Sequence, residues 1–113
     1  MASLLQLVNE QFTKWVEEEN RQLRIIEEAA ASLVAAAKTH PARKPHLKRL
    51  RIAQKNLETA SEQCILYTKL ADYISSDSNL SELPLEGDFI EQLQALELNK
   101  NLPGIINQLT LLD

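Results

Sequence analysis

Glycine, cysteine and aromatic residues are scarce in this chain of 113 residues, and each shortage excludes a structure or a chemistry. Two glycines and four prolines leave few places for turns, which favours long helices over a many-stranded β fold. Two glycines also exclude the glycine-rich loops that cradle phosphate groups. The single cysteine, Cys64, permits no internal disulfide and predicts a reducing compartment.

Long apolar runs and targeting segments are lacking as well. No apolar run approaches the roughly 20 residues that a membrane-spanning helix needs. Residues 1–6 lack the basic and apolar regions of a secretory signal, so we expect a cytoplasmic protein without a membrane span. The apolar content of 44% and charged content of 25% are typical of a globular chain, and the length predicts a single helical domain over residues 1–113.

The sequence contains none of the familiar catalytic or metal-binding motifs. It has no His-Glu-x-x-His, Gly-x-Ser-x-Gly or Glu-x-x-His motif. Its two histidines, His40 and His46, flank the prolines of a turn and make no zinc-binding spacing with Cys64. Residues 17–19 are glutamates that spread around a helical turn, which predicts a solvated face. We therefore expect no enzyme, and no catalytic, cofactor-binding or metal-binding residues.

The charged residues are sorted into blocks along the chain. No Asp or Glu lies between Glu28 and Glu58, whereas seven of the twelve basic residues do. Residues 1–28 have a net charge of −3, residues 29–57 of +7 and residues 58–113 of −8, which together give −4. Charge segregation of this kind bears on partners and encounter rates rather than on the fold.

The first long helix is expected from about residue 3 to residue 38. Apolar residues recur there every three or four positions, and Ser3 stands where an N-cap belongs. The apolar stripe has one polar gap, at Glu19 and Gln22. A helix of this length needs packing along its whole extent.

The second long helix is expected from about residue 45 to residue 75. Pro41 and Pro45 stop one helix and open the next, and Pro45 fits the first turn of a helix. Because the connection is short, the two long helices should form an antiparallel hairpin.

Two short helices are expected after a loop at residues 75–79. Asp88 is placed to cap a helix over about residues 88–99, with Glu91 in the capping-box position. A last helix is expected over about residues 103–112. The predicted fold class is all-α. At the open end of the hairpin we expect a shared core of Phe12, Trp15, Leu66, Leu70, Phe89, Leu93, Ile106 and Leu109.

The apolar residues at the closed end of the hairpin predict self-association. A two-helix tip would leave Leu33, Val34, Leu47 and Ile52 poorly covered, and a second hairpin would complete a four-helix bundle or a larger assembly. Small side chains would let another helix approach closely. The candidate self-association residues are Ala29, Ala30, Leu33, Ala36 and Ala37.

The basic block is a candidate site for an anion or a partner. Lys48 and Arg49 are expected in the first turn of the second helix, where an anion would relieve their conflict with the helix dipole. Alternatively, Lys38, His40 and Arg43 bind the last carbonyls of the first helix. The spacing of four, three and four places Lys44, Lys48, Arg51 and Lys55 on one exposed edge. The candidate residues are Arg43, Lys44, Lys48, Arg49, Arg51 and Lys55.

Three classes of function follow, and the first is favoured. The chain is expected to be a non-enzymatic interaction or assembly module that forms homo-oligomers and recruits a protein partner by helix-on-helix packing. The alternative is a nucleic-acid-associated regulator that docks through residues 43–55. No aromatic residue lies between Ala29 and Leu66, so that segment offers no base-stacking platform. The third class is a small-molecule bundle with a pocket around Trp15 and Tyr67.

Overall fold

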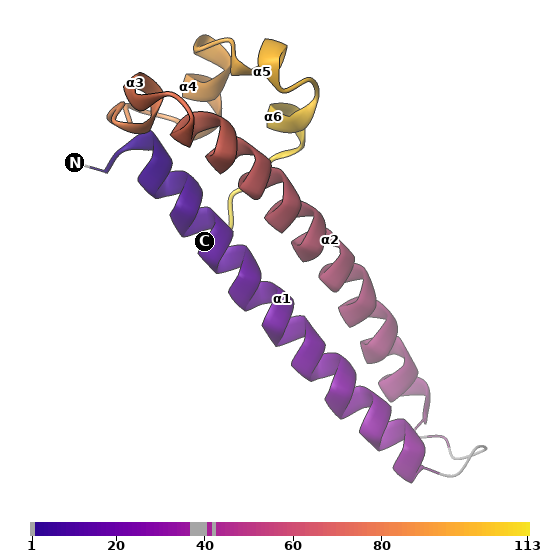
Figure 1. Cartoon of the computed structure of the whole chain (residues 1–113). Coiled ribbons are helices and arrows are strands. Elements are labelled where there is room, and N and C mark those ends of the chain that lie inside the picture. Colours follow the sequence, from indigo (N-terminus) through magenta and orange to yellow (C-terminus); the bar gives the residue numbers. More distant parts are fainter. Residues whose placement is uncertain (1, 37–40, 42) are drawn as a thin grey trace. The chain divides into compact units, whose positions relative to one another are not determined.

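The computed structural model describes residues 2–36, 41 and 43–113 (Figure 1). Helices α1 (Leu4–Ala35) and α2 (Arg43–Ser75) are followed by the short helices α3 (Ser78–Ser81), α4 (Phe89–Ala95), α5 (Leu98–Asn101) and α6 (Ile105–Gln108). The described residues form no strand, apart from one antiparallel bridge between Ser3 and Pro84. The all-α prediction is confirmed, and the two long helices pack against each other as expected.

The residues group into two compact units. Unit 1 comprises Met1–Trp15 and Gln63–Asp113, and unit 2 comprises Val16–Glu62. Both long helices contribute to each unit. The expectation of a single domain over residues 1–113 stays a prediction.

The ends of α1 follow local capping chemistry. Ser3 caps the helix as expected: its Oγ accepts a hydrogen bond from the N–H of Gln6 at 3.2 Å, and Gln6 Oε1 accepts one from the N–H of Ser3 at 2.8 Å. This reciprocal pair is a capping box. The helix ends at Ala35, short of the predicted residue 38, and residues 37–40 lie outside the described part of the chain.

Helix α2 begins at Arg43, two residues before the predicted start at Pro45. Pro45 still lies in the first turn, where its missing N–H has no helical partner to lose. The prediction that Lys48 and Arg49 lie in the first turn of this helix is therefore wrong. Lys48 and Arg49 lie in the second turn, and Arg43 and Lys44 occupy the first.

The short helices differ from the predicted pair in their boundaries. Asp77 caps α3, which falls partly within the expected loop, by accepting a hydrogen bond from the N–H of Asn79 at 2.9 Å. Asp88 caps α4 as expected, accepting from the N–H of Glu91 at 2.9 Å. The helix predicted over residues 88–99 is interrupted at Glu97, which has a left-handed backbone with φ 57°.

This interruption has a packing reason. Leu93 and Leu98 are both buried, with 0% and 3% of their surfaces exposed. Positions five residues apart do not share a face of one continuous helix. The break at Glu97 lets both leucines enter the core.

The last predicted helix, over residues 103–112, is shortened to α6. Residues 109–113, here called the strap, follow α6 without helical structure, starting at Leu109 with φ −68° and ψ 136°. The yellow end of the chain in Figure 1 is this strap. Side chains of α1 and α2 bind the backbone of Gln108, Thr110 and Leu112, and these bonds replace those that a longer helix would make.

Unit 1 holds the core predicted for the open end. Of the eight expected residues, six are buried, whereas Phe12 and Leu66 are half-buried. Tyr67, which is fully buried, stacks on Phe89 with ring centroids 6.5 Å apart and an angle of 15° between the rings. Other fully buried side chains of this unit are Leu4, Val8, Leu70, Ile74, Leu93 and Ile106.

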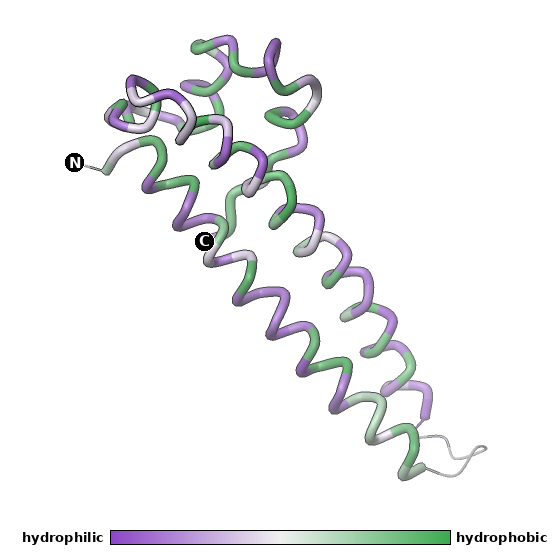
Figure 2. Tube along the Cα trace, viewed as in Figure 1, coloured by the Kyte–Doolittle hydropathy of each residue, from purple (hydrophilic) through white to green (hydrophobic). Residues whose placement is uncertain are grey.

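In unit 2, α1 and α2 run side by side in opposite directions (Figure 1). Apolar residues alternate with hydrophilic ones along both helices, as Figure 2 shows. The buried apolar residues of this unit are small: Ala29, Ala53 and Ala60 are exposed by 2% or less. Alanine allows close approach of two helices but buries little apolar area, so this pair has a thin apolar seam.

Candidate interaction site

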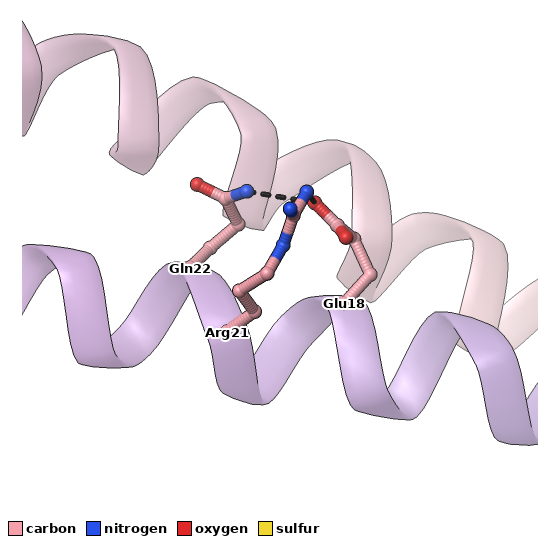
Figure 3. Close-up of polar contacts among 3 residues, drawn as sticks. All are labelled: Glu18, Arg21 and Gln22. Carbon is pink, nitrogen blue, oxygen red and sulfur yellow. Dashed lines mark hydrogen bonds and ion pairs between the residues drawn. The ribbon is translucent and has the colours of Figure 1, made fainter.

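Two of the glutamates predicted to be solvated take part in contacts of unit 2. Glu18 Oε1 accepts hydrogen bonds from Arg21 Nη2 and from Gln22 Nε2, each at 2.7 Å. Figure 3 shows the guanidinium and the amide converging on this carboxylate. Gln22 is only 3% exposed, so the polar gap in the apolar stripe is a buried amide with a partner. This bond lies within α1, so it satisfies the buried amide without linking the two helices.

The contact between Glu18 and Arg21 has a defined electrostatic effect. The hydrogen bond from Arg21 is the main cause that lowers the pKa of the Glu18 carboxyl group, burial opposes this shift, and the hydrogen bond from Gln22 adds to it. In return, Glu18 raises the pKa of Arg21. The Arg21 side chain is 66% exposed, so the pair holds the guanidinium in place at the surface and adds little stability.

A different polar contact joins α1 to α2. Ser61 Oγ donates a hydrogen bond to Glu19 Oε2 at 2.6 Å. Glu19 is half-buried, and together with Gln22 it fills the gap between the apolar residues of α1. The prediction of a fully solvated face at residues 17–19 therefore holds for Glu17 but is wrong for Glu18 and Glu19.

A groove of about 390 Å³ lies between α1 and α2 in unit 2. Helix α1 contributes Arg21, Gln22 and Ile25, and α2 contributes the rest of its lining. The full lining set is Arg21, Gln22, Ile25, Pro45, Lys48, Arg49, Ile52, Ala53 and Asn56. The charged members, Arg21, Lys48 and Arg49, are all cations, so the lining contains no carboxylate.

Arg43 has a capping role in the structure. Its Nη1 donates hydrogen bonds to the carbonyl oxygens of Leu33 and Ala36, at 2.7 and 3.2 Å. These carbonyls lie at the C-terminal end of α1, where helical partners are missing. Of the two roles weighed for the basic block, Arg43 therefore takes the capping one, while Lys38 and His40 lie outside the described residues.

The other five candidate basic residues are exposed. Lys44, Lys48, Arg51 and Lys55 form the basic edge, and their exposure agrees with the spacing prediction. Arg49 is also exposed and lines the groove with Lys48. The structure thus brings two of the six candidates to the groove and places three more along the adjoining edge.

The candidate self-association residues differ in accessibility. Ala29 is fully buried inside the chain, so it already packs within unit 2. Ala30, Leu33 and Ala36 are half-buried, and Ala37 lies outside the described residues. The neighbouring Val34 is 87% exposed.

The aromatic pair suggested for a small-molecule pocket is used by the strap of unit 1. Trp15 Nε1 and the Tyr67 hydroxyl both donate hydrogen bonds to the carbonyl oxygen of Thr110, at 3.1 and 2.9 Å. Their polar groups are therefore engaged inside the chain. Cys64, which lies on the same helix as Tyr67, is half-buried.

Sequence reasoning missed seven of the nine groove residues. Arg21 carried a signal, because Glu18 precedes it by three residues, the spacing of a helical ion pair. Gln22 carried another, as the polar interruption of an apolar stripe. The other five become groove residues only through the pairing of the two helices, which no local pattern specifies: Ile25, Pro45, Ile52, Ala53 and Asn56.

Within the described residues, no group of His, Cys, Asp and Glu side chains could hold a metal ion. Nor does any helix among them have the length and apolar character needed to cross a membrane. Comparison with protein-family models, curated proteins and solved structures finds no match for this chain. The functional argument therefore rests on its own residues.

Proposed function

We propose that this protein is a non-enzymatic interaction or assembly module that self-associates and recruits a protein partner by helix-on-helix packing. The supporting observation is the apolar surface that unit 2 leaves uncovered. Leu23, Val34 and Ile52 are 42%, 87% and 51% exposed. Leu23 and Val34 lie eleven positions apart and therefore share a face of α1.

The proposed contact between copies involves this face of α1. Ala30 lies between Leu23 and Val34 on it, and its small side chain would let a second helix approach closely. The other described candidates, Leu33 and Ala36, lie one and two positions from Val34 and therefore do not share this face. Packing against a second copy would build the four-helix arrangement expected from the sequence.

The test is sedimentation equilibrium of the full chain at high micromolar concentration. We expect a mass above the 12.8 kDa of the monomer. Ala30→Glu should weaken association, because a carboxylate would be desolvated at the contact. Ala95→Glu, at an exposed position of α4 in unit 1, is the matched control and should associate like the unaltered chain. A monomer mass throughout would contradict self-association.

A nucleic-acid-associated regulator is the second candidate, and the basic edge is the observation that favours it. Lys44, Lys48, Arg51 and Lys55 are all exposed and could contact a phosphate backbone together. Such binding would weaken with salt by a log–log slope of roughly −0.9 per phosphate contacted. The net charge of −4 opposes it, because a long polyanion would be repelled by the acidic remainder of the chain.

A further inference from the structure

The groove of unit 2 combines an apolar floor with a rim of cations. We propose that it binds one acidic amphipathic helix of a partner protein, with the apolar face of that helix on the floor and its carboxylates against the rim. This inference rests on the proposed function, since it names the chemistry of the partner that helix packing would recruit.

The lining of the groove suits the apolar face of a helix. Ile25 of α1 faces the same groove as Ile52 and Ala53 of α2. Ala53 is 2% exposed and Ile52 is 51% exposed, so a small residue forms the floor and a large apolar side chain remains open to a partner. A ridge of side chains at three- and four-residue spacing packs into such a groove between two helices.

The cations of the groove favour acidic residues on both flanks of the docked helix. Arg21 stands on the α1 side, and Lys48 and Arg49 stand on the α2 side. Arg21 is held in place by Glu18 at 2.7 Å and keeps further N–H donors for an incoming carboxylate. On the α2 side, Lys44, Arg51 and Lys55 extend the positive charge along the helix. Asp and Glu residues on both flanks of the docked helix would meet this pattern.

The same lining disfavours nucleic acid as the occupant. Its three large apolar contributors, Ile25, Pro45 and Ile52, offer nothing to a phosphate backbone, and none of the nine lining residues is aromatic. A phosphate-binding strand would use the cations and leave the apolar floor in water. An amphipathic helix uses both.

The experiment selects binding partners from a display library of single-helix peptides with randomised surface positions. The bait is the full chain, and the library is first depleted on the support without protein. Peptides that survive should carry apolar residues at helical spacing with Asp or Glu on both sides. Their affinities are then measured by fluorescence anisotropy, together with the sedimentation behaviour of each protein variant.

Two matched pairs locate the site. Ile52→Asp should weaken the selected peptides by at least about tenfold, whereas Ile65→Asp, at a 54% exposed isoleucine of α2 outside the groove, should change affinity less than about twofold. Lys48→Glu with Arg49→Glu should also weaken binding by at least about tenfold. Lys14→Glu with Lys69→Glu changes the net charge equally at exposed residues of unit 1 and should have the smaller effect.

Several outcomes would overturn the inference. Three of these are the absence of enrichment, the enrichment of basic or uncharged peptides, and an equal loss of peptide affinity in both members of a matched pair of variants. It is also overturned if Ile52→Asp converts an associating chain into a monomer, since the groove then holds a second copy. A chain that self-associates but selects no acidic helix contradicts this inference alone, and a monomer that selects one contradicts self-association alone.

Discussion

The Gln63 side chain binds the backbone of Thr110: the side-chain oxygen of Gln63 accepts a hydrogen bond from the Thr110 N–H at 2.9 Å. The amide nitrogen of Gln63 donates in turn to the carbonyl oxygen of Gln108 at 2.8 Å. Gln11 binds both backbone groups of Leu112. Its Oε1 accepts a hydrogen bond from the Leu112 N–H at 2.7 Å, and its Nε2 donates one to the Leu112 carbonyl oxygen at 3.2 Å. Two buried glutamines thus act as partners for an extended strap in unit 1.

Removing one of these glutamines should destabilise the strap. In Gln63→Ala, the N–H of Thr110 and the carbonyl of Gln108 lose their partners, which should lower the free energy of unfolding by about 1–3 kcal/mol. Urea unfolding measures this loss. Gln54→Ala, at an exposed glutamine of α2, should change stability by less than about 0.5 kcal/mol. Equal losses of unfolding free energy in the two variants would contradict a stabilising role for the hydrogen bonds of Gln63.

The core of unit 1 should respond strongly to a cavity. Leu70 has no exposed surface, so Leu70→Ala should cost about 2–5 kcal/mol of unfolding free energy. Leu111→Ala, at a 42% exposed leucine of the strap, is the control and should cost far less. A cost near zero for Leu70→Ala would contradict the core as described.

The close approach of the two helices in unit 2 should make it intolerant of larger residues. Ala60 is fully buried, and Ala60→Leu would push α1 and α2 apart, at a cost of about 1–3 kcal/mol. Ala35→Leu, at an exposed position near the end of α1, should be close to neutral. Thermal unfolding of the two variants compares them directly. Stabilisation by Ala60→Leu would show that this seam is loosely packed.

Stability should fall at high pH because of Tyr67. Burial raises the pKa of Tyr67 to about 12 from an ordinary value of 10.0. The neutral phenol is favoured in the folded state, so its contribution is complete below pH 10 and is lost as the pH rises from about 10 to about 12.

Urea unfolding over that pH range tests this contribution. Tyr67→Phe cannot ionise, so it should show a shallower decline than the unaltered chain. Tyr73→Phe, at a half-buried tyrosine of the same helix, should keep most of the decline. Identical slopes for the unaltered chain and Tyr67→Phe would contradict the assignment.

The sequence predicted the features that depend on local patterns. The spacing of apolar residues indicated both long helices, and the caps at Ser3 and Asp88 were correct because capping is a property of neighbouring residues. The pattern failed where distant side chains decide the backbone. Ile105, Leu109 and Leu112 have helical spacing, yet Gln63 and Gln11, remote in the sequence, hold the strap extended.

The candidate site was likewise predictable only where it depends on local spacing. The exposure of Lys44, Lys48, Arg51 and Lys55 was predictable from spacing alone. The groove was not, because it depends on which turn of α1 faces which turn of α2. Starting α2 two residues earlier than predicted also moved Lys48 and Arg49 out of the first turn, where an anion site had been expected.

Duplex DNA binding is the most direct test of the claim that the chain packs against helices rather than nucleic acid. The measurement is a gel shift at sub-micromolar protein and physiological salt, with a salt titration of any complex. The account predicts no measurable binding. A salt-sensitive complex would contradict it and assign the basic edge to nucleic acid, if substituting Lys48 and Arg51 together abolishes that complex or reduces its log–log slope of affinity against salt by about two.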